Sequence, residues 1–182
     1  MFNGNIDKND QANGELNIGG GLEWISEEEG LTLGISYLSD LAVTDALFLS
    51  EQETPAQKQA GALSAYVLLV FEQHEITGEI VTALEKFDQL DPEIDQPMAW
   101  NLELAWMPAP KWQLAFRIEG SSELDDAPKR QYGVGSSWLI GGNTHLSIDY
   151  LRGEYPHGLV EDDDENELKS TQSFAIQLSV GF

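Results

Sequence analysis

Six polar side chains in the middle of the sequence combine charge, hydrogen-bonding capacity and regular spacing. They are Glu79, Asn101, Glu103, Arg117, Glu119 and Asp149. Each stands at an alternate position of a segment whose intervening positions hold large apolar residues, so in an extended chain all six face away from those residues. Carboxylates grouped around one guanidinium can set charge selectivity or hold a polar solute. The plainer alternative is a set of solvated wall residues that form cross-strand pairs.

Nine segments that alternate apolar and polar residues must position these side chains. They span residues 15–24, 31–39, 61–72, 75–87, 99–106, 111–121, 131–140, 144–152 and 173–182. Short turns are expected at 26–30, 73–74, 108–110 and 141–143, and long polar links at 3–14, 41–59, 88–98, 122–130 and 153–170. Consecutive turns of an up-and-down sheet lie at opposite ends, so one rim carries the short turns and the other the long links. This all-β, antiparallel layout is typical of an outer-membrane β-barrel.

Aromatic residues gather toward the two ends of these segments. Near the short turns stand Trp24, Phe71, Trp106, Trp112, Trp138 and Phe182, and toward the long links stand Tyr37, Trp100, Tyr132 and Tyr150. Indole and phenol rings prefer the headgroup level of a bilayer, so two belts around an apolar band predict a wall that faces lipid. The opposite face, with its Glu and Arg residues, would then line a water-filled lumen. The alternative is a soluble acidic β-barrel that binds a small ligand, with the apolar face inside and the polar face toward water.

The composition excludes several other classes of protein. The 32 acidic and 9 basic residues give a net charge of −23, which makes nucleic-acid binding untenable because such binding needs Lys and Arg. There is no cysteine, so disulfides and zinc–thiolate sites are excluded. No apolar run reaches the roughly 18 residues that a transmembrane helix needs. We expect no cofactor.

Two local motifs point to ordinary surface structure rather than to a reaction centre. The acidic run 161–167, with Asp162, Asp163 and Asp164, is a weak candidate for a cation site, and a solvated loop is the better interpretation. His74-Glu75 lacks the second histidine of a zinc-protease helix, because Gly78 stands in its place. We therefore predict that the protein is not an enzyme.

The strand count bears on the extent of the domain. Nine strands that end on the short-turn rim would start on the long-link rim, whereas bacterial single-chain barrels have even strand numbers. We therefore expect residues 1–182 to be one domain with nine or ten strands of a barrel truncated at its N-terminus. Residues 1–14 would be part of a loop that follows a missing strand.

Two segments carry a resemblance to a known family. Residues 76–87 (ITGEIVTALEKF) and 97–104 (PMAWNLEL), followed by Arg130-Gln131-Tyr132 and the acidic loop 161–167, resemble the legiobactin-type siderophore porins, the LbtU family. The alternation that ends at Phe182 is similar to the terminal strand that outer-membrane proteins present to the barrel-assembly machinery. The resemblance implies a bacterial outer-membrane barrel linked to siderophore uptake, with the lipid bilayer, that machinery and a ferric siderophore as partners.

The function that follows is a passive or facilitated route for a siderophore or another small solute across the outer membrane. Two rivals stay open: a structural or adhesive barrel whose lumen carries no flux, and the soluble ligand-binding barrel. A requirement for detergent would separate the soluble protein from both membrane forms, and conductance would separate the two membrane forms.

Overall fold

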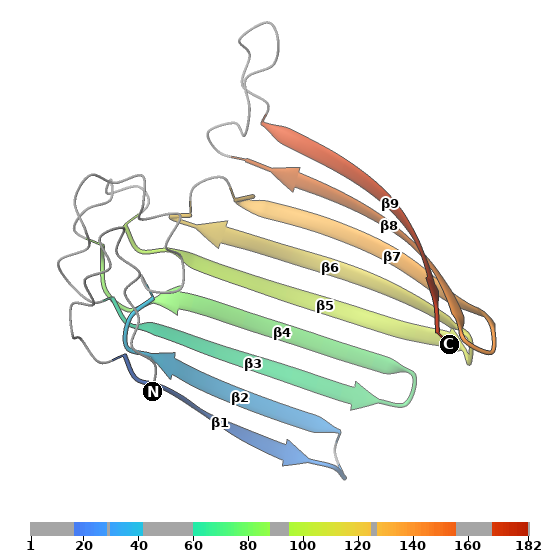
Figure 1. Ribbon diagram of the computed structural model, residues 1–182, viewed down its shortest axis with the longest axis horizontal. Helices are drawn as coiled ribbons and strands as arrows, with labels where there is room; N and C mark the ends of the chain where they lie inside the picture. Colours follow the sequence, from blue (N-terminus) through green and yellow to red (C-terminus); the bar gives the residue numbers. More distant parts are fainter. Residues whose placement is uncertain are drawn as a thin grey trace, which may run out of the picture.

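The computed structural model describes residues 17–28, 30–41, 60–87, 95–124, 127–155 and 169–181. Within them the chain forms nine strands and no helix: β1 (Gly19–Ser26), β2 (Leu31–Leu38), β3 (Ala62–Phe71), β4 (His74–Ala83), β5 (Met98–Ala109), β6 (Trp112–Ser122), β7 (Arg130–Gly141), β8 (Thr144–Glu154) and β9 (Ser170–Val180). All pair antiparallel in one sheet whose spatial order is the order of the sequence (Figure 1). The predicted all-β, up-and-down fold is confirmed.

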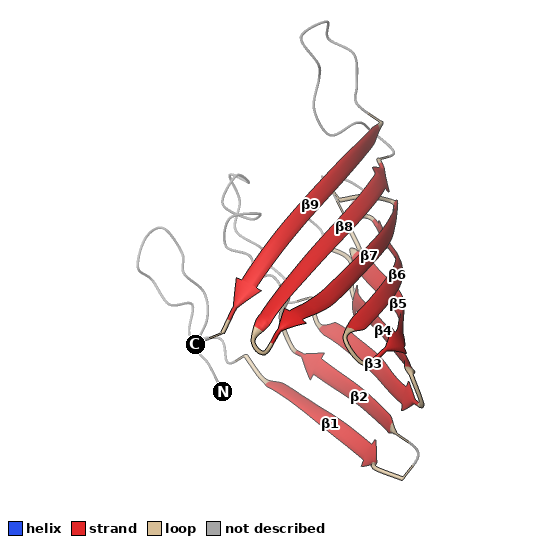
Figure 2. Ribbon diagram, turned by 90° about the vertical axis from the view of Figure 1, so that its right-hand side faces the viewer, coloured by secondary structure: helices blue, strands red, loops and turns tan. Residues whose placement is uncertain are grey.

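The connections alternate as the sequence predicts. Short turns join β1 to β2, β3 to β4, β5 to β6 and β7 to β8 at one end of the sheet, and the strand ends that the longer links connect lie at the other end (Figure 1). Among the described strands, β1 and β9 are the free edges, because each is paired on one side only. With nine strands, β1 and β9 run in the same direction. The sheet bends into an open trough between these two edges (Figure 2).

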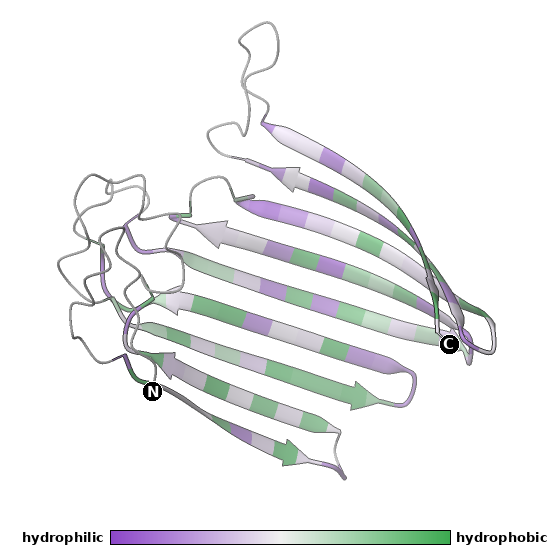
Figure 3. Ribbon diagram, viewed as in Figure 1, coloured by the Kyte–Doolittle hydropathy of each residue, from purple (hydrophilic) through white to green (hydrophobic). Residues whose placement is uncertain are grey.

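The register separates the sheet into two chemically different faces. Residues paired across neighbouring strands lie on the same face, and the pairs Leu22–Ile35, Ile76–Leu104 and Ile148–Ile176 belong to one apolar face that runs through all nine strands. The other face holds the polar pairs, for example Glu79–Asn101 and Ser147–Gln177, among small and a few apolar residues. Figure 3 shows this alternation clearly along β2 and β5, whereas β3 is apolar at consecutive positions toward its short-turn end. The apolar face carries charged side chains only near its long-link end, at Arg130, Arg152 and Glu154.

The accessibility of the two faces indicates which one is concave. Ala105 on the polar face is 4% exposed, whereas its neighbours Leu104 and Trp106 on the apolar face are each 40% exposed. Side chains on the inner side of a curved sheet crowd together and those on the outer side spread apart. The polar face therefore lines the inside of the trough, and the apolar face covers its outside.

Several strand boundaries differ from those expected. The pairing of β1 begins later than residue 15 and continues to Ser26, and β9 begins at Ser170 rather than residue 173. β4 ends at Ala83 instead of residue 87: the amide of Leu84 still bonds to the carbonyl of Gly61, which lies opposite it in the register, and the amide of Phe87 then bonds to the carbonyl of Asp95 in the link that follows. The turn after β3 is formed by residues 72–73, and His74 already belongs to β4.

The expected turn at 108–110 is also displaced. β5 continues to Ala109 because a register shift between Trp106 and Ala109 absorbs the extra residues, and Ala109 then pairs with Trp112. A bulge accommodates Pro108, which cannot donate to a regular ladder. A similar shift between Leu139 and Gly141 precedes the turn to β8.

Candidate functional site

A row of polar side chains crosses the concave face obliquely, from the middle of β1 to β4 toward the long-link ends of β5 to β7. The register places Glu23, Gly34, Tyr66, Glu79, Asn101, Glu119 and Gln131 in one line across β1 to β7. We call this line the polar row. Each of its carboxylates accepts a hydrogen bond from a neutral donor in the same row, so the row consists of three acceptor–donor pairs.

The first pair spans three strands because the middle strand has no side chain in the way. The hydroxyl of Tyr66 on β3 donates to the carboxylate of Glu23 on β1. Between them, on β2, lies Gly34, where any Cβ would overlap the ring of Tyr66. A glycine at this position therefore lets the phenol lie flat across the sheet and reach its acceptor.

The second and third pairs join neighbouring strands. The Asn101 amide donates to Glu79 with an Nδ2 to Oε2 distance of 3.4 Å, and the Gln131 amide donates to Glu119. Glu119 also forms an ion pair with Arg117, with 3.2 Å between Nε and Oε2. The side chains of Arg117 and Glu119 are 38% and 26% exposed, so this pair is partly screened by water.

Not all six polar residues predicted from the sequence belong to this row. Glu79, Asn101 and Glu119 do, and Arg117 joins them through its ion pair. Glu103 lies in the next line of the register, opposite Arg117, and Asp149 lies one line further toward the short turns, opposite Gly135. All six lie on the concave face, as the alternation indicates.

An open hollow of about 310 Å³ adjoins the middle of the row. Glu79, Asn101 and Glu119 line it together with Leu124 and Pro128 from the link between β6 and β7. The hydroxyl of Ser121 donates to the carbonyl of Pro128 over 2.9 Å, which ties the end of this link to the concave face. Charged and apolar groups therefore meet at the long-link end of the trough.

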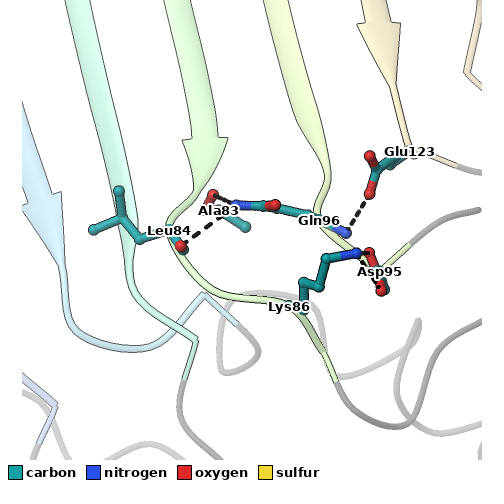
Figure 4. Close-up of polar contacts among 6 residues, drawn as sticks. All are labelled: Ala83, Leu84, Lys86, Asp95, Gln96 and Glu123. Atoms are coloured by element: carbon teal, nitrogen blue, oxygen red, sulfur yellow. Dashed lines mark hydrogen bonds and ion pairs between the residues drawn. The ribbon is translucent and has the colours of Figure 1, made fainter. Parts of the chain in front are cut away.

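A network of polar contacts holds the rim beside this hollow (Figure 4). The Lys86 ammonium contacts both carboxylate oxygens of Asp95 at 2.8 Å, and the Gln96 side-chain amide donates to the carbonyls of Ala83 and Leu84. The backbone amide of Gln96 donates to Glu123 Oε2 over 2.9 Å. These bonds join the link after β4 to the end of β6.

The ion pair at this rim changes the acidity of both partners. The hydrogen bond from Lys86, assisted by its charge, lowers the pKa of Asp95, and the hydrogen bond to Asp95 raises the pKa of Lys86. A lowered carboxyl pKa adds stability above the ordinary value near 3.9, and this contribution is lost as the pH falls through the folded-state pKa. The raised pKa of Lys86 adds stability below its ordinary value near 10.4, and it is lost as the pH rises through the folded-state value.

We therefore expect the rim to open in acid before the sheet does. The amide of Phe87, which donates to the carbonyl of Asp95 over 2.7 Å, should lose protection from hydrogen exchange as the pH falls from about 6 to about 2. Exchange rates corrected for intrinsic pH dependence and measured by mass spectrometry on the segment 84–87 test this. The Lys86→Met variant should abolish the pH dependence, and equal protection at both pH values in the native protein would contradict it.

The structure places the predicted aromatic residues on the convex face. All five tryptophans, Trp24, Trp100, Trp106, Trp112 and Trp138, lie there together with Tyr150, which pairs with Phe174. The ring of His74 stacks between Phe71 and Trp106, with centroid distances of 5.1 and 6.4 Å. The Trp112 indole donates to the hydroxyl of Ser136 over 2.8 Å. Phe182 and the acidic residues Asp162, Asp163 and Asp164 lie outside the described residues.

Sequence reasoning missed several members of the site. Tyr66 was not selected, although it is the one aromatic side chain that the register of the described strands places on the polar face. In residues 61–72, Leu63, Val67 and Leu69 occupy odd-numbered positions and Tyr66 an even-numbered one. Period-two alternation therefore places Tyr66 on the face away from these apolar residues, and this could have indicated it. Nothing local indicated Glu23 or Gln131 as partners, because their pairing depends on the register between strands.

No protein-family model matches this chain, and no curated protein matches it. In the described part of the chain, no group of three His, Cys, Asp or Glu residues could hold a metal ion. No helix among those residues is long and apolar enough to cross a membrane.

Proposed function

We propose that this protein is part of a bacterial outer-membrane β-barrel that provides a water-filled route for a small solute. The convex face would contact lipid and the concave face would line the route. The observation that carries the proposal is the sense of the two faces: apolar side chains cover the outside of the trough and polar side chains line its inside. A soluble barrel that buries an apolar ligand needs the opposite sense.

The dimensions of the sheet support the same function. The strands β3 to β9 have 10 to 12 residues, and a tilted transmembrane strand needs about 9 to 11. The exposed apolar residues of the convex face, such as Leu102 at 47% and Phe116 at 51%, would form a large hydrophobic patch in water. In a bilayer the same residues contact acyl chains, and the tryptophans can occupy the interfaces.

A closed barrel requires partners for the free edges of β1 and β9, because unsatisfied backbone groups are costly in lipid. We propose that further strands close the sheet and that the barrel-assembly machinery inserts it. The resemblance to legiobactin-type siderophore porins makes a ferric siderophore the proposed solute.

The membrane orientation can be tested with cysteines introduced at neighbouring positions, since the chain has no native cysteine. Leu102→Cys and Phe116→Cys lie on the convex face, and Asn101→Cys and Arg117→Cys lie on the concave face. In protein inserted into liposomes, we expect a water-soluble maleimide to label positions 101 and 117 only. A fluorophore attached at 102 or 116 before insertion should be quenched by brominated lipids.

Positions 101 and 102 control for each other, as do positions 116 and 117, because the two residues of each pair are adjacent in one strand and lie on opposite faces of the sheet. Equal labelling of all four positions in liposomes would contradict the lipid-facing assignment. A protein that stays monomeric without detergent would favour the soluble barrel. Conductance in a planar bilayer then distinguishes a conduit from a structural or adhesive barrel.

A further inference from the structure

We propose that the polar row gives this route a preference for cations, with Glu79 and Glu119 as the residues that set it. This inference rests on the proposed function and adds the charge class of the solute. It concerns carboxylates distributed over the width of the trough: Glu23, Glu79 and Glu119 stand on β1, β4 and β6 in one line of the register. With strands about 4.8 Å apart, the row spans roughly 24 Å between β1 and β6.

The hydrogen bonds of the row leave its negative charge in place. Tyr66, Asn101 and Gln131 are neutral donors, so they orient the carboxylates of Glu23, Glu79 and Glu119 without neutralising them. Arg117 is the one guanidinium on the concave face of the described strands, and it is engaged by Glu119 at 3.2 Å. The row and Arg117 together therefore carry a net charge of about −2, counting three carboxylates against one cation.

The rest of the concave face has the same sign. Its strands add three more carboxylates, Glu75, Glu103 and Asp149, and no further Lys or Arg among the described residues. Rings of carboxylates favour cations in pores, whereas rings of Arg and Lys favour anions. A cationic or neutral metal chelate would enter such a route more readily than a polyanionic one.

The hollow beside the row indicates where this charge acts on a solute. Leu124 and Pro128 line it together with Glu79 and Glu119, so apolar groups border the same hollow as the two carboxylates. Apolar walls reduce the local screening by water and strengthen the field of nearby charges. Glu79 and Glu119 should therefore contribute more to selectivity than Glu23, which lies beside the free edge of β1.

The test is the reversal potential of the protein in a planar bilayer under a KCl gradient. We expect potassium to permeate several-fold better than chloride, and more so at low salt, where screening is weak. The double variant Glu79→Gln/Glu119→Gln keeps the size of both side chains and one acceptor oxygen of each. It should bring the permeability ratio well below that of the native protein, although the other carboxylates of the concave face remain. Arg117→Gln removes a positive charge and should raise the potassium-to-chloride permeability ratio, opposite to the effect of the double variant.

Glu28→Gln is the matched control, because it removes the same charge from an exposed turn at the far end of the sheet and should leave the ratio unchanged. A native protein that conducts without a cation preference would overturn this inference but not the proposed conduit. The same holds if the permeability ratio is unchanged in both the Glu79→Gln/Glu119→Gln and the Arg117→Gln variants. An inserted, folded protein without conductance would overturn the conduit itself. Migration on unboiled gels confirms that each variant is folded.

Discussion

The variant Gly30→Ala should lose about 3 kcal/mol of stability, the largest loss we expect from a single methyl group. Gly30 has a φ of +62°, which costs an L-residue roughly 1–2 kcal/mol. A Cβ there would also overlap the carbonyl oxygen of Val70, at a separation under 3.0 Å. Relieving such an overlap by shifting backbone adds roughly 1–3 kcal/mol. The hydrogen bond from the Val70 amide to the Gly30 carbonyl, 2.8 Å long, would be distorted as well.

This expectation can be measured as the urea midpoint of the heat-resistant gel band after folding into detergent or lipid. Gly20→Ala is the control, because Gly20 lies in β1 with nothing within 4 Å of the added Cβ. The control should be neutral or slightly stabilising, since alanine reduces the freedom of the unfolded chain. A loss at Gly30 no larger than that at Gly20 would mean that the turn between β1 and β2 adapts freely.

The variant Gly34→Ala should cost roughly 1–3 kcal/mol, because the added Cβ displaces the ring of Tyr66 from the surface of β2. Moving the ring also separates the Tyr66 hydroxyl from Glu23 and opens the first pair of the polar row. Tyr66→Phe, which keeps the ring over Gly34 and loses only the hydroxyl bond, should cost about 1 kcal/mol.

A double-mutant cycle isolates the steric cause of the Gly34 effect. In a Tyr66→Ala background the space above Gly34 is empty, so Gly34→Ala should cost little there and show a coupling energy of about 1–3 kcal/mol. The readout is the same urea midpoint. Additive effects of the two substitutions would show that Tyr66 and Gly34 do not interact, and that the phenol reaches Glu23 by another path.

The two faces were predictable because period-two alternation depends only on local geometry. Once Leu102 and Leu104 are assigned to one face, Asn101 and Glu103 must lie on the other. The order of the strands followed from the alternation of short turns and long links, because consecutive strands in an up-and-down sheet are neighbours. The nine strands occur where the alternation predicts them.

The polar row was not predictable to the same extent, because it depends on contacts between strands. The link between β2 and β3 is long, and its turn chemistry does not fix which residue of β2 faces Tyr66. The Tyr66–Glu23 bond also requires a side chain to cross a whole strand, which no local pattern encodes. After β4 the amide of Phe87 bonds to the carbonyl of Asp95, a contact across the link to β5 that no local pattern encodes either.

The strict neighbour-to-neighbour pairing of the sheet makes each hairpin a separable unit. In the described strands, every strand pairs through its backbone only with those that precede and follow it in sequence, and the Tyr66–Glu23 bond between β3 and β1 is made by side chains alone. Strand direction alternates along the sheet, so adding or removing two strands leaves the direction of every other strand unchanged. Duplication or deletion of one hairpin would therefore also keep the same face of each remaining strand on the inside. Each such event would change the width of the sheet by about 10 Å, the spacing of two strands. The width of a sheet built in this way can therefore evolve in discrete steps without redesign of its two faces.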